Sequence, residues 1–482
     1  MSFEDKDLQS IQEARILVER AKVAQETLKE YEQSYLDKLV SGLIESFNSE
    51  VDHTIETVHN SLQLGNEADE KQLFHLFIES FKEDYELKKY VGLLEFNELN
   101  QGVEVGIPLG VIGVKLPATN LVLNLIYTTL ICLKTGNALV VVPNSHAVQE
   151  TNQLVHLLNE LITKGQGPTN VISCMQSVSS LGVSELCNHK FLDLFINIGS
   201  TEFMTVIEKG KTPYLFGGVG SSPVFIERSA DIDSACQSIV TSRALNNGLL
   251  PGAEQYVIVE NVVSEQVKKQ LISKGAYFMS QSEEVLLLKL IFPDYNKLAA
   301  NYIGKSASYL AQKAGFDVPK TTTVLVSEQP YINDENPYAE DLPIPLLTYY
   351  LEPDWLRACE KCIALIEYKK NGHTLVIHSQ NKDIITEFIL KKPVGRVIVN
   401  GSGGLSSIGI ESKLPTSMIL GGLTTKKGFS AQNITPKDLT YQRSVAYQTT
   451  KKCEPLKVSK EEVLDGLDEL NVFAELLKEI TN

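Results

Sequence analysis

The sequence lacks the features of exported and membrane-spanning proteins. No run of about 18 apolar residues occurs, and a membrane-spanning helix needs roughly that length. The most apolar stretch, 121–133, is interrupted by an asparagine and two threonines. The start of the chain is acidic and polar, unlike a secretory or transit signal. We therefore expect a cytoplasmic protein with no membrane partner.

Cysteine is sparse and shows no pairing pattern. The 482 residues include seven cysteines, of which only Cys359 and Cys362 are close together. In a chain without an export signal, this indicates reduced thiols rather than a disulfide framework. A C-x-x-C pair also occurs in metal and redox sites, but Trp355, Ile363 and Ile366 recur around it at helical spacing and no second ligand pair is near. We predict a buried helix here and no metal site.

Positive charge is in deficit. Lysine and arginine number 44 against 60 acidic residues, which gives a formal net charge of −16. Such a field repels phosphate backbones and excludes nucleic acid as the main partner, although a local basic patch can still bind an anionic cofactor. The hydrophobic fraction of 43% and the charged fraction of 22% are ordinary for a globular protein. The length predicts two or three domains.

The hydrophobic pattern predicts helices first and then an alternating α/β order. Apolar residues recur at spacings of three and four across residues 7–90. Residues 91–96 and 103–107 then flank a turn-rich segment, which predicts a β-hairpin. A strand, a helix and a strand follow at 110–116, 121–133 and 138–143. This βαβ order is typical of a parallel, nucleotide-binding sheet.

The alternation continues to a candidate phosphate site. A helix is expected at 148–163, and strands are expected at 171–175 and 191–198. After Gly199, the residues from Ser200 to Glu202 offer hydroxyls and backbone N–H groups at an expected helix start. Phosphate oxygens bind well at such a position. An ordinary helix N-cap explains the same residues, so the motif alone leaves both interpretations open.

A second α/β block begins near Ser229. Helices are expected at 231–245 and 264–274, and strands at 255–259, 323–326, 374–378 and 396–400. Gly401, Gly403 and Gly404 then predict a flexible loop. From Lys457 the sequence predicts an amphipathic C-terminal helix that begins with a capping box. This helix either docks on its own chain or binds a protein partner.

Several motifs carry a resemblance to a known family. At 108–120 (PLGVIGVKLPATN) the chain resembles the aldehyde dehydrogenase superfamily, and in particular its CoA-acylating branch. It is similar to the aldehyde dehydrogenase half of bifunctional aldehyde–alcohol dehydrogenases, and it ends before their iron-dependent half would begin. The resemblance spans roughly residues 12–450, with further motifs LKTGN at 133–137, SADID at 229–233, KGAYF at 274–278, GHT at 372–374 and GRVIVN at 395–400.

The resemblance implies an α/β architecture with a Rossmann-like NAD(P) domain, an α/β catalytic domain and a β-hairpin arm for oligomerisation. The N-terminal helices and the first domain would span 1–228, with the arm hairpin at about 91–107, and the second domain would span 229–420. A return segment and the rest of the arm would follow at 421–450, and the C-terminal helix at 457–482. By the same resemblance, the protein forms homodimers or higher oligomers.

The chemistry that the resemblance implies begins with a cysteine thiolate, which attacks the aldehyde carbonyl. An asparagine side chain and the cysteine's backbone N–H hold the developing oxyanion. Hydride then passes to the nicotinamide of NAD or NADP, and CoA attacks the resulting thioester. Asn120 matches the asparagine, and His373, in the GHT motif, matches a residue beside the active site of relatives. The residues matched to the cofactor site are Leu116, Thr119, Gly199, Ser200, Gly218 and Glu340.

The nucleophile position departs from the family pattern. Relatives read asparagine-glycine-x-x-cysteine followed by a glutamate-glutamine pair, and here the segment from Asn247 to Gln255 reads NGLLPGAEQ. The cysteine position is therefore Pro251, which has neither a nucleophile nor a backbone N–H. Loss of one oxyanion donor alone costs about a hundred- to a thousand-fold in rate. Cys236, in the preceding helix, is expected to pack inside rather than replace the thiol.

These departures predict a pseudoenzyme with the fold of an acylating aldehyde dehydrogenase. The family's glycine-rich segments have also changed, to GGVGSS at 217–222 and GGLTTKKGFS at 421–430, which alters the expected cofactor and CoA contacts. The protein would sense NAD(H) or an acyl-CoA, or bind a partner such as an active paralogue. Two alternatives stay open: an active oxidoreductase with direct hydride transfer, and a structural subunit of an assembly.

Overall fold

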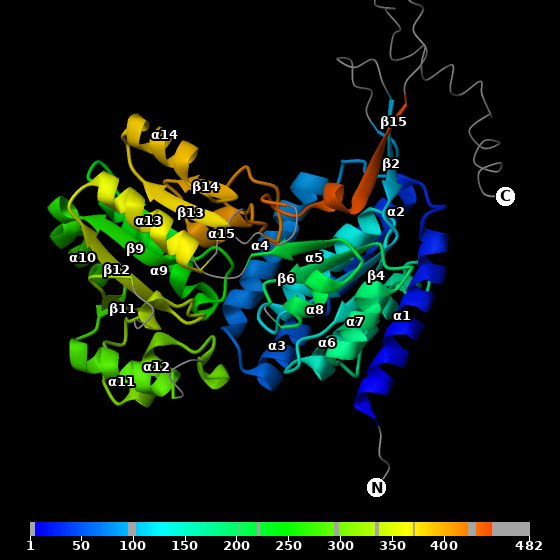
Figure 1. The fold of residues 1–482 in the computed structure, drawn as a ribbon, viewed down its shortest axis with the longest axis horizontal. Helices are drawn as coiled ribbons and strands as arrows, with labels where there is room; N and C mark the ends of the chain where they lie inside the picture. Colours follow the sequence, from blue (N-terminus) through cyan, green and yellow to red (C-terminus); the bar gives the residue numbers. More distant parts are fainter. Residues whose placement is uncertain are drawn as a thin grey trace, which may run out of the picture.

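The protein has a mixed α/β fold built around three β-sheets (Figure 1). Two large parallel sheets form the centres of two lobes, and a smaller antiparallel sheet projects from the first lobe. The predicted α/β fold class is therefore confirmed. The structure is a computed structural model that describes residues 5–94, 103–200, 202–218, 222–293, 298–332, 337–369, 372–422 and 430–445.

Four helices open the chain, as the spacing of apolar residues predicts. α1 begins where the Asp5 carboxylate accepts hydrogen bonds from the backbone N–H groups of Asp7 and Leu8. α4 begins in the same way at Asn66, whose side chain accepts from the N–H of Asp69. The apolar faces of these helices are buried in the first lobe. The bounds are α1 Lys6–Leu28, α2 Gln33–Asn48, α3 Val51–Leu62 and α4 Glu67–Tyr85.

The first lobe holds a five-stranded parallel sheet in the order β5-β4-β3-β6-β7. α5 follows β3 and is buried along its whole length, because it packs between this sheet and the N-terminal helices. One polar residue of α5 is satisfied within the helix: the Thr128 hydroxyl donates to the carbonyl oxygen of Asn124 at 2.6 Å. The bounds are β3 Val111–Lys115, α5 Leu121–Lys134, β4 Ala138–Val142, α6 Val148–Lys164, β5 Ile172–Cys174, α7 Ser180–Asn188, β6 Leu194–Ile198, α8 Met204–Lys209 and β7 Tyr214–Gly217.

The second lobe holds a seven-stranded parallel sheet in the order β10-β11-β12-β9-β8-β13-β14. Its central strands β8, β9 and β13 are fully buried, as expected where helices cover both faces. α13 carries Cys359 and Cys362 into an apolar cluster, which confirms the predicted buried helix. The bounds are β8 Ser222–Ile226, α9 Ile232–Ala244, β9 Glu254–Glu260, α10 Ser264–Ser273, β10 Ala276–Phe278, α11 Gln281–Ile291, α12 Ala307–Ala314, β11 Val324–Glu328, β12 Leu346–Glu352, α13 Trp355–Lys369, β13 Thr374–His378, α14 Lys382–Lys391, β14 Arg396–Val399 and α15 Gly403–Ser407.

The third sheet is an antiparallel arm made from two segments that lie far apart in the sequence (Figure 1). β1 (Gly92–Leu93) pairs with β2 (Val103–Pro108), so the predicted hairpin is present, although β1 is shorter than predicted and the turn lies outside the described residues. β15 (Thr440–Val445) pairs with the other edge of β2. The role of this arm in oligomerisation stays a prediction.

Two predictions of local structure are wrong, and one lies outside the described residues. Gly403 and Gly404 begin the buried helix α15 instead of a flexible loop. Ser200 does not start a helix, because α8 begins further along the chain. The helix predicted from Lys457 falls in the part of the chain that is not described. Among the helices that are described, none combines the length and the apolar character needed to cross a bilayer.

Candidate functional site

The order of strands in the first sheet creates a crevice at its carboxyl edge. From β3 the chain continues through α5 to β4 on one side, whereas from β6 it continues to β7 on the other side. The loops that leave β3 and β6 therefore diverge, and in parallel α/β sheets ligands bind at such a switch point. Pro117 and Thr119 follow β3, and Ile198 and Gly199 lie at the end of β6.

A cavity of about 120 Å³ opens at this switch point, between the two lobes. Loops before β9 and β12 of the second lobe form its opposite wall, and the segment that returns toward the arm contributes Met418 and Leu420. The described lining residues are Pro117, Thr119, Asn120, Asn124, Ile198, Gly199, Gly217, Gly218, Gly248, Leu249, Leu250, Pro251, Asp341, Pro343, Met418 and Leu420. The cavity therefore brings together Thr119, Asn120, Gly199, Gly218 and Pro251 from the sequence-predicted site.

Asn120 is the polar link between the two walls of the cavity. Its backbone has a left-handed conformation, with φ of 48°, which an asparagine tolerates better than most residues. Its side-chain N–H donates to the carbonyl oxygen of Leu249 at 2.9 Å, and its side-chain oxygen accepts from the amide of Asn246 at 2.8 Å. The Asn120 side chain is thus held by the loop that carries Pro251.

The Asn246 amide continues this network to the N-terminal helices. Besides Asn120, it donates to the carboxylate of Glu70 at 3.2 Å, and its backbone N–H donates to Asp69 at 2.8 Å. Its side-chain oxygen accepts from the N–H of Asn66 at 2.6 Å. Burial raises the pKa of Glu70 to about 7, and the hydrogen bond from Asn246 offsets part of that rise. A titrating carboxyl is therefore two hydrogen bonds from the cavity wall.

Asn124 presents an unused hydrogen-bond acceptor in the cavity wall. Its side-chain N–H donates to the carbonyl oxygen of Thr119 at 3.1 Å, whereas its side-chain oxygen is buried and has no hydrogen-bond partner among the described residues. A buried amide oxygen without a donor is costly. Sequence analysis did not select Asn124. Its position one helical turn after Asn120, in an otherwise apolar helix, is the signal that was available.

Pro251 lies in a loop that is held in place by two serine hydroxyls and by the packing of α15. The Ser407 hydroxyl donates to the carbonyl oxygen of Pro251 at 3.3 Å, and the Ser222 hydroxyl donates to that of Gly252 at 2.9 Å. α15 packs so closely beneath this loop that a Cβ on Gly403 would lie 2.6 Å from the Gly252 carbonyl oxygen. The two glycines that the sequence assigned to a flexible loop are therefore needed for close packing under Pro251.

Glu254 is a buried carboxyl directly beyond this loop. One of its oxygens accepts from the backbone N–H of Gly403 at 2.6 Å, and the other has no hydrogen-bond partner. Burial raises the pKa of Glu254 to about 7, against smaller opposing effects of hydrogen bonds from Ser242 and Gly403. Glu254 does not line the cavity, so it supports the loop rather than meeting a ligand.

None of the six described cysteines lies in the cavity wall. All six are buried, and Cys236 lies in α9, packed against the sheet of the second lobe as predicted. Burial raises the pKa of Cys236 and of Cys187 to about 12, so these thiols are protonated at neutral pH. Among the described lining residues, only Thr119 and Asp341 carry a side-chain oxygen that belongs to a hydroxyl or a carboxyl group.

Four sequence-predicted site residues lie away from the cavity wall. Leu116 is fully buried, and its N–H donates to the carbonyl oxygen of Val142 in the sheet. His373 is also buried, and its Nδ1 lies 3.0 Å from the hydroxyl of Thr374. It packs behind Gly218, because a Cβ on that glycine would lie 2.9 Å from the His373 ring. His373 therefore lies directly behind the lining residue Gly218 and does not itself line the cavity.

Ser200 and Glu340 are also absent from the described lining of the cavity. The Ser200 hydroxyl accepts from the N–H of Glu202, and its carbonyl oxygen accepts from the side chain of Asn197. The carbonyl oxygen of Glu340 accepts from the side chains of Gln255 and Tyr256. It is the next residue, Asp341, that lines the cavity, and sequence analysis missed it.

A buried lysine beside the crevice is already neutralised. Lys115, at the end of β3, lies 2.8 Å from the carboxylate of Glu202 and donates to the carbonyl oxygen of Pro143 at 2.7 Å. Burial lowers the pKa of Lys115, and the Glu202 carboxylate partly restores it. This ion pair occupies the region where the sequence suggested a phosphate site. In the described residues, no group of three or more His, Cys, Asp or Glu side chains is arranged to hold a metal ion.

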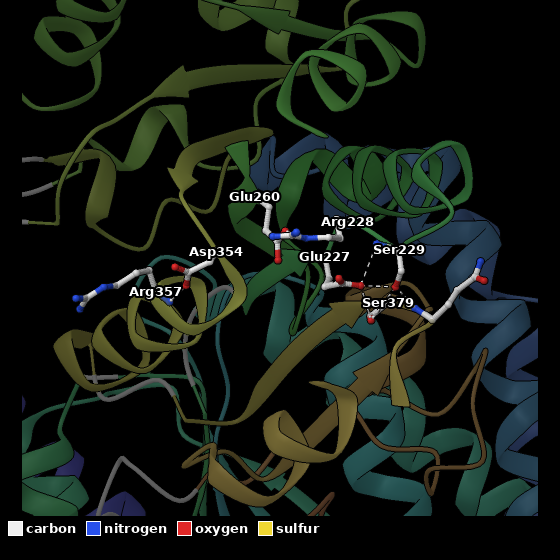
Figure 2. Close-up of polar contacts among 8 residues, drawn as sticks. Glu227, Arg228, Ser229, Glu260, Asp354, Arg357 and Ser379 are labelled. Atoms are coloured by element: carbon white, nitrogen blue, oxygen red, sulfur yellow. Dashed lines mark hydrogen bonds and ion pairs between the residues drawn. The ribbon is translucent and has the colours of Figure 1, made fainter. Parts of the chain in front are cut away.

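The SADID motif lies away from this cavity, at the switch point of the second sheet (Figure 2). The loops after β8 and β13 diverge there, and a carboxylate joins them. Glu227 is buried and accepts from the backbone N–H of Ser229 at 3.0 Å and from the hydroxyl of Ser379 at 2.8 Å. Arg228 extends beside it to pair with the buried carboxylate of Glu260. The motif therefore closes this crevice with internal hydrogen bonds.

Comparison with known proteins agrees with this geometry. A model described as the aldehyde dehydrogenase family matches residues 6–280, which is more than half of the chain. The chain belongs to the aldehyde dehydrogenase family. A crystal structure of a probable aldehyde dehydrogenase from Listeria monocytogenes superposes with a TM-score of 0.88 at 33% identity, and the alignment covers 93% of this chain and 99% of that one.

Relatives of this aldehyde dehydrogenase-family chain include acylating enzymes. An acetylating aldehyde dehydrogenase from Geobacillus thermoglucosidasius has a TM-score of 0.88 at 28% identity, over 94% of this chain and 100% of that one. The bifunctional aldehyde–alcohol dehydrogenase of Escherichia coli is 26% identical over 443 residues, which is 91% of this chain and 50% of the relative. The chain spans about half the length of that relative. It resembles CoA-acylating aldehyde dehydrogenases.

Proposed function

We propose that this chain is a pseudoenzyme of the acylating aldehyde dehydrogenase branch, which binds a nicotinamide nucleotide or an acyl-CoA and acts as a sensor or a binding partner. The observation that carries the proposal is Pro251 in the cavity wall, at the position that the resemblance of the NGLLPGAEQ segment to the family motif gives to the cysteine. Proline supplies no thiolate and no backbone N–H, so it removes the nucleophile and one oxyanion donor together.

The other groups around the cavity support the loss of thiol chemistry. One N–H of the Asn120 amide is committed to the carbonyl oxygen of Leu249. No described cysteine lines the cavity, and the pKa of Cys236 is raised to about 12 by burial. A covalent thiohemiacetal therefore has no described thiolate from which to form.

A nucleotide fits the remaining features of the site. The cavity lies at the switch point of a parallel sheet, where dinucleotides bind in Rossmann-like folds. Gly199, with a positive φ of 54°, has no neighbouring atom that would prevent the close approach of a ligand. The unpartnered oxygen of Asn124 is suited to accept from a carboxamide N–H, the group that a nicotinamide carries. NAD and NADP are both compatible with these contacts, and CoA use is proposed from the acylating relatives alone.

Direct hydride transfer is the second candidate function, and the place of Asp341 favours it. This carboxyl lines the cavity opposite Asn120 and Asn124, where it could exchange a proton with a bound carbonyl compound. His373 and Glu340 were expected to serve such a reaction, and neither is among the described residues that line the cavity.

Assembly is the third part of the proposal. The antiparallel arm of β1, β2 and β15 projects from the first lobe, and in the described part of the chain the outer edges of β1 and β15 pair with no further strand, which suits them for pairing with another subunit. We propose a cytoplasmic homodimer or higher oligomer, joined through this arm, with the segment 457–482 as a helix for an active paralogue or another protein. Removal of residues 457–482 tests the last point: oligomer mass or capture of the paralogue should change, and no change in either would contradict it.

The experiment that tests the pseudoenzyme proposal is an activity assay on the purified chain. Acetaldehyde, CoA and either NAD⁺ or NADP⁺ are supplied together, and reduced nucleotide is followed by absorbance, with an active acylating relative as the positive control. We expect no CoA-dependent reduction above the protein-free rate. Robust CoA-dependent reduction would contradict the proposal. Reduction of an aldehyde by NAD(P)H without any cysteine requirement would instead establish the hydride-transfer alternative.

A further inference from the structure

A lysine and a cysteine from distant segments meet at the edge of the second lobe. Lys392 follows α14, directly before the strand β14, and Cys359 lies in the first half of α13. The Lys392 Nζ donates to the backbone carbonyl oxygen of Cys359 at 2.9 Å and also contacts the Cys359 sulfur. The nitrogen and the sulfur are therefore in direct contact although 33 positions separate them in the chain.

The surroundings of this lysine are unusual for a buried amine. Lys392 is only 7% exposed, and its Nζ lies 4.1 Å from the centre of the Phe388 ring. Its described partners are a carbonyl oxygen, a sulfur atom and a ring face, with no carboxylate among them. The Glu387 carboxylate forms an ion pair with the neighbouring Lys391 instead. Buried amines usually pair with a carboxylate, so this one is held against a thiol by packing rather than by an opposite charge.

We propose that Lys392 and Cys359 form an oxidation-dependent covalent cross-link, in which one oxygen atom bridges the lysine nitrogen and the cysteine sulfur. Two observations carry this site: the direct contact of nitrogen and sulfur, and the absence of a carboxylate from the described partners of the amine. Both residues are buried, so the oxidant must be a small neutral molecule. Cys362 lies one helical turn away and is 0% exposed; Lys392 is near enough to lower the pKa of its thiol, against the larger rise caused by burial, but the direct contact of Lys392 Nζ is with the Cys359 sulfur.

The chemistry balances with hydrogen peroxide as the oxidant. One peroxide converts the Cys359 thiol to a sulfenic acid and releases one water, as the peroxide O–O bond breaks and an S–O bond forms. A second peroxide accepts the next two electrons. The sulfenic oxygen then bonds to Lys392 Nζ, one N–H and one O–H bond break, and two more waters leave. The product is a secondary amine joined through oxygen to sulfur, and four equivalents of an added thiol return it to amine, thiol and water.

The cross-link would fasten α13 to the entrance of β14. β14 leads through the Asn400 turn to α15, the helix that packs beneath the Pro251 loop. Closing a covalent loop of this length restricts the unfolded chain, so oxidised protein should melt at a higher temperature, by on the order of 5 °C. The bridge makes stability of the second lobe respond to the redox state, and it does not depend on whether the cavity binds a nucleotide.

Peptide mass spectrometry tests this directly on the full-length protein. Trypsin cleaves after Arg357, Lys361, Lys391 and Arg396, which places the two residues in the peptides 358–361 and 392–396. After peroxide treatment we expect one species with the summed mass of both peptides plus one oxygen and minus two hydrogens. Dithiothreitol should separate it. Sulfenic or sulfinic acid on 358–361 without a joined species would overturn the proposal, and so would a joined species that lacks the oxygen.

Variants separate the pair from its surroundings. Cys359→Ser and Lys392→Arg should each abolish the joined peptide and the peroxide-dependent rise in melting temperature. Cys362→Ser removes a buried thiol from the same helix and should leave both readouts in place. Loss of the joined species in Cys362→Ser, or its persistence in Lys392→Arg, would contradict the assignment. The measurement on the unmodified protein stands even if a variant does not fold.

Discussion

The side chain of Asn120 donates its hydrogen bond to the carbonyl oxygen of Leu249, two residues before Pro251. This contact joins the loop after β3 to the loop before β9, so it ties the two walls of the cavity together. In the family's mechanism the same asparagine amide serves the oxyanion. Here one of its N–H groups holds the backbone of the loop in which the nucleophile would lie.

Substitution of Asn120 should therefore affect stability strongly. Asn120→Ala leaves the buried Leu249 carbonyl and the Asn246 amide without this partner and places alanine at a φ of 48°. We expect a loss of about 3 kcal/mol in the free energy of unfolding, measured by urea denaturation. Asn120→Gly loses the same hydrogen bonds without the backbone strain, so it should be about 1 kcal/mol less damaging. Equal losses in the two variants would show that the left-handed conformation is not maintained.

Substitutions of Asn124 distinguish an effect on nucleotide binding from an effect on stability. Asn124→Ala removes a single hydrogen bond, to the Thr119 carbonyl oxygen, together with the unpartnered acceptor in the cavity wall. We expect a stability loss of about 1 kcal/mol and a weakening of nicotinamide nucleotide binding by roughly tenfold. Asn124→Asp keeps an acceptor and is the matched control, with binding nearer to that of the unmodified chain. Unchanged binding in Asn124→Ala would remove Asn124 from the ligand site.

Replacement of Pro251 by cysteine should give weak activity at most. Pro251→Cys supplies a thiol and a backbone N–H, but the amide of Asn120 stays engaged with Leu249. We expect CoA-dependent reduction of NAD(P)⁺ at least about a hundredfold slower than in an active acylating relative. Pro251→Ala restores the N–H alone and should be inactive. A Pro251→Cys rate equal to that of the relative would mean that the proline is the sole defect.

Glu254 should make stability fall as the pH rises. Its pKa in the folded chain is raised from 4.5 to about 7 by burial, so the unfolded chain ionises first. The stability that Glu254 contributes is complete below pH 4.5 and is lost as the pH rises through 7, by about 3 kcal/mol. Glu254→Gln should be relatively more stable at pH 8 than at pH 5. The exposed Glu265→Gln is the control and should follow the unmodified chain at both values.

Gly403 should tolerate no side chain. A Cβ there would lie 2.6 Å from the Gly252 carbonyl oxygen and 2.8 Å from the Glu254 carboxyl carbon. We expect Gly403→Ala to destabilise the protein by about 1–3 kcal/mol and to weaken nucleotide binding, since it displaces the Pro251 loop. At Gly401 the nearest atoms are side-chain groups at 3.1 Å, so Gly401→Ala should cost less. Thermal denaturation with and without the nucleotide measures both effects.

Periodicity predicted the fold better than it predicted the local structure of loops. The spacing of apolar residues placed α1 to α5 and the buried strands β3, β4 and β13, because burial of one face or of both faces leaves a direct pattern in the sequence. Gly403 and Gly404 were misassigned to a flexible loop. Their small size serves contacts with Gly252 and Leu250, which lie about 150 positions away and leave no local signal.

The candidate site was predicted in part for a similar reason. Thr119 and Asn120 were selected from the family resemblance, and both line the cavity because they follow a strand at a switch point. His373 was selected from a short motif, yet its ring packs behind Gly218. Asp341 was missed because it becomes part of the site only when the two lobes meet, whereas Asn124 could have been found from its position one helical turn after Asn120.

The most direct test of this account is a calorimetric titration of the purified protein with NAD(H), NADP(H) and CoA in turn. The account predicts micromolar binding of at least one nicotinamide nucleotide, lost or weakened in Asn124→Ala, in a protein that shows no CoA-dependent oxidation of acetaldehyde. No binding of any of the three compounds would contradict the proposed nucleotide sensor and leave the fold as a scaffold for protein partners.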